Sequence, residues 1–241
     1  MLDSYRLFGQ AMLAYLRGGP GRLTFERDDG FRDPSDVKPY FAPFARWSTA
    51  ERRAIRHARG HVLDVGSGAG RVALYLQRRG LRVTAIDVAP EAVECARLRG
   101  VHDARRMDAR QLSFSDGSFD TIVMFGNNLG VCGDLAATKR FLRKARRVAR
   151  PGGRLLASTG VPAVWAKPHA AYVKRNVRRG LPPGLVRLRI VYNGKRGDWF
   201  PLLFLGTDDL LRVCKATGWA VGEVFPEPGG RSHYAFTAVR A

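Results

Sequence analysis

The feature that most constrains the fold is a glycine-rich segment, Leu63-Asp-Val-Gly-Ser-Gly-Ala-Gly70, between a predicted strand and a predicted helix. Residues 61–66 form a short apolar run typical of a buried strand, and residues 71–79 have helical spacing that ends at Gly80. Glycines let the backbone approach a ligand closely, and the first turn of the next helix presents unpaired N–H groups. The segment therefore predicts a ligand site, although its GxGxG spacing differs from the GxGxxG of dinucleotide sites.

The chain after this segment alternates between strand-like and helix-like stretches. Further strands are predicted at 82–87, 103–108, 119–126 and 153–160, and helices at 90–100 and 134–150. Such alternation predicts an α/β protein with a Rossmann-like, doubly wound and mostly parallel sheet. Ligands of this architecture bind at the carboxyl ends of the strands, so the residues that follow each strand are the informative ones.

The segments outside this core are predicted to cover it and to complete it. Residues 1–53 are expected to form a helical and irregular cap over the ligand cleft, irregular at 24–44 and with a capping box from Ser48 to Glu51. After the core at 54–160, residues 161–206 are a substrate-side insertion, with a helix near 170–178 and a β-hairpin of strands 185–192 and 198–205. Residues 207–241 supply the last helix and two closing strands.

Composition narrows the classes of protein. The 241 residues are 45% hydrophobic with a formal net charge of +20, which excludes a disordered, collagenous or membrane-spanning chain. Three dispersed cysteines predict neither disulfides nor a metal site, and the apolar run near the N-terminus lacks the features of a signal peptide. We therefore expect a cytoplasmic protein without a metal or a membrane partner.

Polar residues follow the second, third and fourth predicted strands. Asp87 ends the second strand, where a carboxylate accepts hydrogen bonds from vicinal ribose hydroxyls. Asp108 ends the third strand and follows Met107, so an acceptor for an exocyclic amine stands beside an apolar side chain suited to an adenine face. Asn127 and Asn128 follow the fourth strand, where two amides could hold a ligand or form a turn.

Together these residues resemble the class I S-adenosylmethionine-dependent methyltransferases. The glycine-rich segment resembles the first motif of that family, Asp87 its ribose-binding acid, and Met107-Asp108-Ala109 its adenine-binding position. Residues 114–120 and 150–156 resemble the stretches that lead into its fourth and fifth strands. The resemblance implies a seven-stranded sheet whose last strand is antiparallel, and S-adenosylmethionine as the cofactor.

The resemblance also implies a set of cofactor-binding residues that come from the segments after the strands. Asp64, inside the first strand, would support the methionine end of the cofactor. The full set is Asp64, Gly66, Ser67, Gly68, Gly70, Asp87, Val88, Asp108, Ala109, Phe125, Asn127 and Asn128.

Methyl transfer is an in-line displacement that mostly requires alignment of the acceptor and exclusion of water. A base is needed only where the acceptor must lose a proton. Of the five histidines, His169 in the insertion is the best candidate, although an exposed loop histidine without a role is the alternative. We predict a small-molecule acceptor, methylated on oxygen, nitrogen or carbon. RNA is the alternative acceptor, because basic side chains crowd residues 139–150 and 174–179, and a nicotinamide-dependent oxidoreductase is a weaker alternative.

Overall fold

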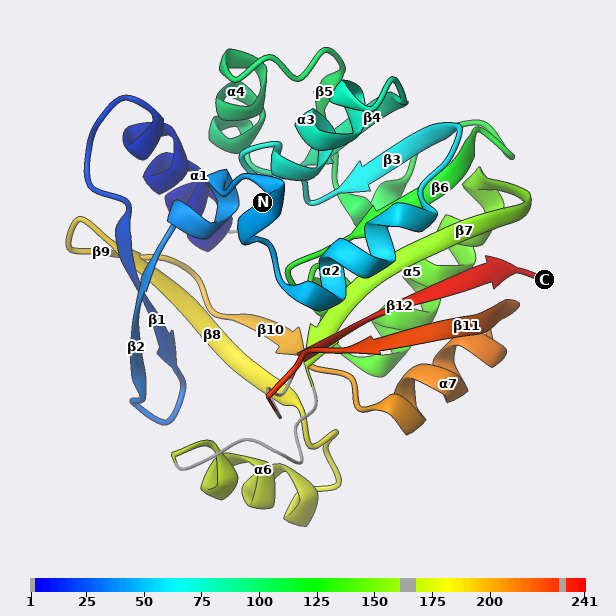
Figure 1. Cartoon of the computed structure of the whole chain (residues 1–241). Helices are drawn as coiled ribbons and strands as arrows, with labels where there is room; N and C mark the ends of the chain where they lie inside the picture. The colour runs from blue at the N-terminus through cyan, green and yellow to red at the C-terminus, as the bar shows by residue number, and fades with distance from the viewer. Residues whose placement is uncertain (1–2, 161–167, 230–232) are drawn as a thin grey trace. The chain divides into compact units, whose positions relative to one another are not determined.

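The computed structural model describes residues 3–160, 168–229 and 233–241 (Figure 1). Its helices are α1 (Asp3–Leu16), α2 (Thr49–Ala54), α3 (Arg71–Arg78), α4 (Pro90–Leu98), α5 (Leu135–Val148), α6 (His169–Arg178) and α7 (Thr207–Lys215). Its strands are β1 (Arg22–Arg27), β2 (Arg32–Asp36), β3 (His61–Val65), β4 (Arg82–Asp87), β5 (Ala104–Arg106), β6 (Phe119–Met124), β7 (Ala149–Gly160), β8 (Leu185–Tyr192), β9 (Lys195–Arg196), β10 (Phe200–Leu203), β11 (Trp219–Pro226) and β12 (His233–Arg240).

The main sheet confirms the predicted α/β class. It has seven strands in the order β11-β12-β7-β6-β3-β4-β5. The pairs β3–β4, β4–β5 and β6–β7 are parallel, whereas β12 is antiparallel to both β7 and β11. The chain divides into two compact units, which are described separately: residues 1–47, 61–111 and 187–200, and residues 48–60, 112–186 and 201–241.

In the first unit, β3, β4 and β5 carry the glycine-rich segment and pack with α3 and α4. Helix α1 lies along α4 (Figure 1), where Arg6 forms an ion pair with Glu91 at 2.8 Å. Gly9 permits this close packing, because an added Cβ would lie 3.0 Å from the backbone nitrogen of Ala92. Helix α1 is therefore fixed on the element that follows β4.

The first unit also contains a small antiparallel sheet that corrects one prediction. Residues 24–44, predicted to be irregular, include most of β1 and all of β2, and β1 pairs with β8 on its other side. The sequence of β2 looks like a loop because Pro34 and three charged residues interrupt it. Such a composition suits an edge strand, where the missing N–H of proline faces solvent. The hairpin after β8 is confirmed, although its turn is shorter than predicted: Asn193 and Gly194 connect β8 directly to β9.

In the second unit, β6, β7, β12 and β11 lie between helices (Figure 1). Helix α2 contacts β7, β12 and β11, while α5 and α7 pack against each other and against β7 and β11. The largest fully buried side chains here include Trp219, Phe119, Phe141 and Phe236. Helix α6 matches the helix predicted near 170–178. Across the described residues, no helix is both long enough and apolar enough to traverse a bilayer.

Candidate cofactor site

The glycine-rich segment forms a tight loop between β3 and α3, in the first unit. The backbone nitrogens of Gly66 and Ser67 both donate to the carbonyl oxygen of Ile86, at 2.9 and 3.0 Å. Gly68 and Gly70 have φ of +51° and +77°, a region that favours glycine. An added Cβ at Gly70 would lie 2.6 Å from Val101, so this glycine also permits close packing of the loop. The first residues of the loop are thus held against β4, and glycine at positions 66, 68 and 70 keeps its backbone accessible at every second residue.

Asp87 closes this loop from the end of β4. Its carboxylate accepts hydrogen bonds from the backbone nitrogens of Gly68 and Ala89, each at 2.9 Å. Burial raises the pKa of Asp87, and the amides of Ala89, Gly68 and Val88 act in the opposite direction. The predicted ribose-binding acid is therefore held beside the glycine loop, and it shapes that loop as well.

Asp64 lies inside β3 and is only 2% exposed. Burial raises its pKa to about 7, while the Arg71 guanidinium and the amide of Ala73 lower it and the charge of Asp87 raises it further. Its Oδ2 atom has no hydrogen-bond partner among the described residues, and neither does the buried hydroxyl of Ser67 in the loop. Unpaired buried polar atoms are costly, so their presence beside a bare loop fits a site for a ligand that carries hydrogen-bond donors.

Asp108 follows β5 and is engaged within its own segment. Its carboxylate accepts from the backbone nitrogen of Arg110 at 2.8 Å and pairs with the guanidinium of that residue at 2.6 Å. The Arg110 hydrogen bonds lower the pKa of Asp108. Ala109 starts the short 3-10 helix Ala109–Gln111, and Val88 follows β4 directly. Contact of these three residues with the cofactor stays a prediction.

One side chain of the N-terminal helix α1 lies close to the glycine loop. An added Cβ at Gly68 would lie 3.2 Å from the terminal methyl carbon of Met12, which belongs to α1. The aromatic residues that the sequence places ahead of the core pack internally: Phe44 stacks on Tyr75 with ring centroids 4.3 Å apart, and the Arg71 guanidinium lies 4.7 Å from the Trp47 ring. These aromatic rings therefore pack against side chains of α3.

A second polar cluster lies in the other unit, at the carboxyl ends of β6 and β7. The backbone nitrogen of Gly126 donates to Glu51 Oε1 at 3.0 Å and to Ser158 Oγ at 2.9 Å. The Ser158 hydroxyl in turn donates to the same Glu51 oxygen at 2.9 Å. Glu51 is 6% exposed, so this cluster is a buried carboxylate fixed by two strands.

The predicted residues after β6 come from the turn that also contains Gly126. Asn127 adopts φ of +62° and accepts a hydrogen bond from Thr159 Oγ1 at 2.8 Å, while the Leu205 amide donates to that hydroxyl at 3.2 Å. The orientation of the Asn127 amide is therefore set by a chain of donors. Phe125 is buried and Asn128 is half-buried. Their contact with the cofactor stays a prediction.

Glu51 is the residue that sequence reasoning missed as part of a polar cluster. One of the two hydrogen bonds of the predicted capping box is present: Ser48 Oγ accepts from the backbone nitrogen of Glu51 at 3.1 Å. The Glu51 side chain turns to Gly126 and Ser158 instead, and the carboxylate of Glu227 caps the nitrogens of Thr49 and Ala50. No local pattern predicts these contacts, because the partners lie 75 to 178 residues apart in the chain.

Replacing Glu51 with alanine should destabilise the protein by about 2–3 kcal/mol, since it removes charge-assisted hydrogen bonds from buried partners. Urea-induced unfolding followed by fluorescence measures this change. Glu223→Ala is the matched control: its carboxylate is 61% exposed and pairs with His57 at 3.5 Å, so a loss below about 1 kcal/mol is expected. Equal losses in the two variants would show that the Glu51 cluster contributes nothing special.

His169, the candidate base from the sequence, is the first residue of α6 in the second unit and is half-buried. Its role as a base stays a prediction.

Comparisons with known proteins agree on one family. Residues 63–157 match the model of a methyltransferase domain. A ubiquinone biosynthesis O-methyltransferase of Xanthomonas oryzae pv. oryzae is 35% identical over 133 residues, 51% of this chain and 54% of that protein. One of Xanthomonas campestris pv. campestris is 36% identical over 141 residues, 54% of this chain and 56% of that protein. The chain thus matches about half the length of these curated relatives.

The fold comparison extends over the whole chain. The crystal structure of a SAM-dependent methyltransferase from Bacteroides fragilis, in complex with S-adenosyl-L-homocysteine, covers 100% of this chain and 97% of its own, with a TM-score of 0.84 and 29% identity. A possible histamine N-methyltransferase from Thermotoga maritima, 17% identical with a TM-score of 0.59, covers 98% of this chain and 100% of its own and shows the fold alone. Because the glycine loop closed by Asp87 falls inside the matched domain, the family recognised from the sequence is confirmed. The chain belongs to the class I S-adenosylmethionine-dependent methyltransferases.

Proposed function

We propose that this protein transfers the methyl group of S-adenosylmethionine to a hydroxyl oxygen of a small molecule. The observation that carries the proposal is the glycine loop closed by Asp87, with the unpaired acceptors of Asp64 and Ser67 beside it. Support for an oxygen acceptor comes from the Xanthomonas relatives, which are named O-methyltransferases.

The proposed cofactor-binding residues of the first unit have surroundings that suit their roles. Asp87 would accept hydrogen bonds from the ribose hydroxyls, and the loop from Gly66 to Gly70 would lie against the cofactor without side-chain interference. Asp64 would face the cationic methionine end, where a positive charge favours the ionised form of a carboxyl with a pKa of about 7. When bound, S-adenosylmethionine supplies a methyl group on a sulfonium, an excellent leaving group.

Transfer to a hydroxyl forms one oxygen–carbon bond, breaks one sulfur–carbon bond and releases the proton of the acceptor. His169 is the candidate that the sequence offers to take that proton. If it is the base, His169→Asn would lose at least 100-fold in rate and show a changed pH profile.

The test is methyl transfer from radiolabelled S-adenosylmethionine to a panel of matched acceptors: catechol, aniline, thiophenol and an unstructured RNA. The proposal expects label in the catechol-type hydroxyl compounds. Labelling confined to the amine would assign another acceptor atom, and labelling confined to RNA would replace the small-molecule assignment with the alternative that the sequence left open.

Replacing Asp87 with asparagine should weaken binding of S-adenosylhomocysteine by about 10- to 100-fold, equal to about 1.5–3 kcal/mol for hydrogen bonds to a charged group. Calorimetric titration measures the change. Asp103→Asn is the matched control, because Asp103 precedes β5 and pairs with Arg105 at 2.6 Å, away from the glycine loop. Unchanged affinity in Asp87→Asn would remove this residue from the site.

A further inference from the structure

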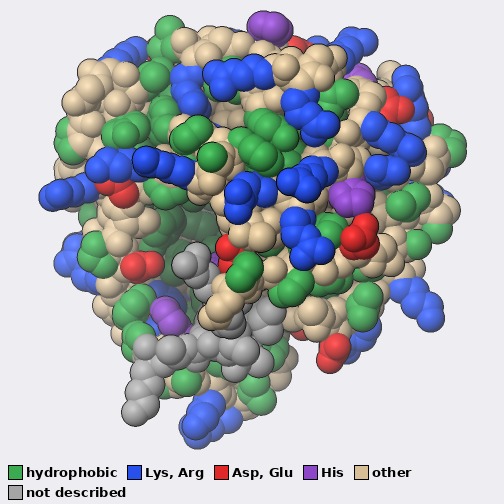
Figure 2. Space-filling view, in the orientation of Figure 1, with side chains coloured by type: hydrophobic (Ala, Val, Ile, Leu, Met, Phe, Trp, Pro, Cys, Tyr) green, Lys and Arg blue, Asp and Glu red, His purple; other side chains and the backbone are tan. Residues whose placement is uncertain are grey.

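Lys and Arg side chains are scattered over the face that Figure 2 shows, so net charge alone identifies no binding site. One face of the small sheet in the first unit differs, because the strand register gathers its arginines. Thr24 pairs with Pro34 and Val191, and Glu26 pairs with Arg32 and Arg189. Directly opposite residues point to the same face of a sheet, and that face is here called the arginine face. Its side chains are Arg22, Thr24, Glu26, Arg32, Pro34, Asp36, Arg187, Arg189, Val191 and Arg196.

The opposite face of this sheet is the buried one. Leu23 and Ile190 are 5% and 2% exposed, and the Phe25 ring lies 6.0 Å from Phe8 of α1. Helix α1 therefore packs on that side, and the arginine face is directed away from α1. The arginines on it are not required by the core of the unit.

Positive charge exceeds negative charge on this face. Glu26 forms ion pairs with Arg189 at 2.9 Å and with Arg196 at 3.5 Å. The hydrogen bond from Arg189 is the main cause of the lowered pKa of Glu26, and the charge of Arg32 lowers it further. Two guanidinium groups thus pair with one carboxylate, and Arg32 lies directly opposite it on β2. The second carboxylate on this face belongs to Asp36, and it accepts a hydrogen bond from the backbone nitrogen of Lys38 at 2.8 Å. A surplus of guanidinium groups around one point is suited to phosphate oxygens.

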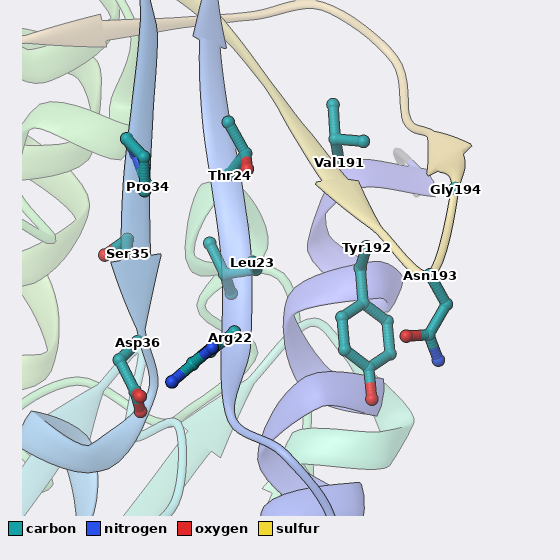
Figure 3. A pocket seen from close by; sticks show the side chains of 10 residues that line it. All are labelled: Arg22, Leu23, Thr24, Pro34, Ser35, Asp36, Val191, Tyr192, Asn193 and Gly194. Carbon is teal, nitrogen blue, oxygen red and sulfur yellow. The ribbon is translucent and has the colours of Figure 1, made fainter.

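An aromatic ring and a pocket accompany the charge. The half-buried Trp199 ring lies 4.4 Å from the Arg189 guanidinium and 5.8 Å from that of Arg187. At one end of the face lies a cavity of about 550 Å³ (Figure 3), where Arg22 extends toward Asp36 and the Asn193 side chain stands at the hairpin turn. Thr24, Asn193 and Asp36 give this pocket both donors and acceptors. Its size is that of a site for a small organic group.

These features favour one kind of occupant. A bilayer would require apolar anchors, yet the exposed large apolar side chains in the described part of the chain, such as Leu98, Val177 and Leu211, all lie outside this sheet. A second copy of the chain that packed through the same face would place two sets of arginines against each other, and their like charges would repel. A single RNA strand offers phosphates to the arginines, unpaired bases to the pocket and planar rings to guanidinium groups.

We propose that the arginine face binds single-stranded RNA, with phosphates on Arg32, Arg189 and Arg196 and a base in the pocket beside Arg22. The proposal goes beyond the methyl transfer proposed above and does not depend on it. Arg32 and Arg189 lie opposite Glu26 on the two strands that flank β1, so their backbones are about 10 Å apart across the sheet. Arg196 lies on β9, which pairs with β8, so an extended RNA strand that crosses the sheet would meet all three arginines.

Fluorescence polarisation with a labelled 12-nucleotide oligouridylate tests this proposal. The variant Arg32→Ala/Arg196→Ala should bind at least 10-fold more weakly than the natural protein at low salt. Its plot of log affinity against log salt should be less steep by about 1.4, which is the loss of two phosphate contacts on a single strand.

The matched control is Arg140→Ala/Arg143→Ala, which removes two exposed arginines from α5 and lowers the net charge equally. This control should bind within about twofold of the natural protein. Titration with S-adenosylhomocysteine reports whether each variant is folded, so a loss of RNA binding can be separated from a loss of structure. Equal weakening in both variants would reduce the effect to overall charge and overturn the proposal. Binding of phosphatidylserine vesicles or polyglutamate that is as tight and as sensitive to the same two substitutions would also overturn it, in favour of those partners.

Discussion

Replacing Gly68 with valine is expected to abolish binding of S-adenosylhomocysteine, with a loss of at least 100-fold in affinity. Gly68 has φ of +51°, where a β-branched residue is strained, and its backbone nitrogen is the donor that links the loop to Asp87. The added side chain would also lie against the methyl carbon of Met12, which an ideal Cβ already approaches to 3.2 Å. Both effects act on the surface that the cofactor would touch.

A control separates backbone strain from loss of the site. Gly80 has φ of +78° after α3, and an added Cβ there would meet no atom within 4 Å. Gly80→Val carries comparable strain away from the loop, so it should lose stability while it keeps its affinity for S-adenosylhomocysteine. Calorimetry on both variants, each shown to be folded by circular dichroism, measures the difference. Retained binding in Gly68→Val would mean that the loop does not contact the cofactor.

Replacing Asp64 with asparagine should change how stability depends on pH. A carboxyl with a pKa of 3.8 in the unfolded chain and about 7 in the folded protein binds more protons when folded between these values. Stability therefore falls as pH rises from about 4 to 7, and the penalty is fully present above pH 7. The asparagine variant has no carboxyl to ionise at this position, so it does not lose this stability. As pH rises from about 4 to 7, its unfolding free energy should therefore increase relative to that of the natural protein by up to about 4 kcal/mol.

Urea-induced unfolding at pH 4.5, 6 and 8 measures this increase. Subtracting the stability difference at pH 4.5 from the differences at pH 6 and 8 removes packing effects that do not depend on pH. Asp108→Asn is the control with the opposite sign. Because the Arg110 hydrogen bonds lower the pKa of Asp108, the natural protein should be favoured over this variant at neutral pH and lose that advantage as pH falls. A constant difference between Asp64→Asn and the natural protein would contradict the raised pKa.

The part of the fold that the sequence predicts best is the part held by local patterns. The glycine segment, the acid that ends β4 and the parallel strands β3, β4 and β6 each have a signature within about ten residues. Asp87 is found where its strand position indicates, with its carboxylate on the loop that the same reasoning selected. Local chemistry determines these features, so reading the sequence recovers them.

The features that were missed depend on partners far apart in the chain. Strand β1 pairs with β8, more than 160 residues later, and this pairing makes a strand of a segment with weak local preference. Glu51 has the pattern of a capping residue, yet its carboxylate is held by Gly126 and Ser158. Tertiary contacts override local preference in both cases, as is expected for β structure and buried polar groups.

We expect the loop from Gly66 to Gly70, closed by Asp87, to bind the cofactor of the family. Calorimetric titration of the purified, nucleic-acid-free protein with S-adenosylhomocysteine tests it most directly, with reduced nicotinamide cofactor as the parallel ligand. We predict saturable binding of S-adenosylhomocysteine at one site and no binding of the nicotinamide. Absence of S-adenosylhomocysteine binding by the folded protein, or binding that survives Gly68→Val unchanged, would contradict it.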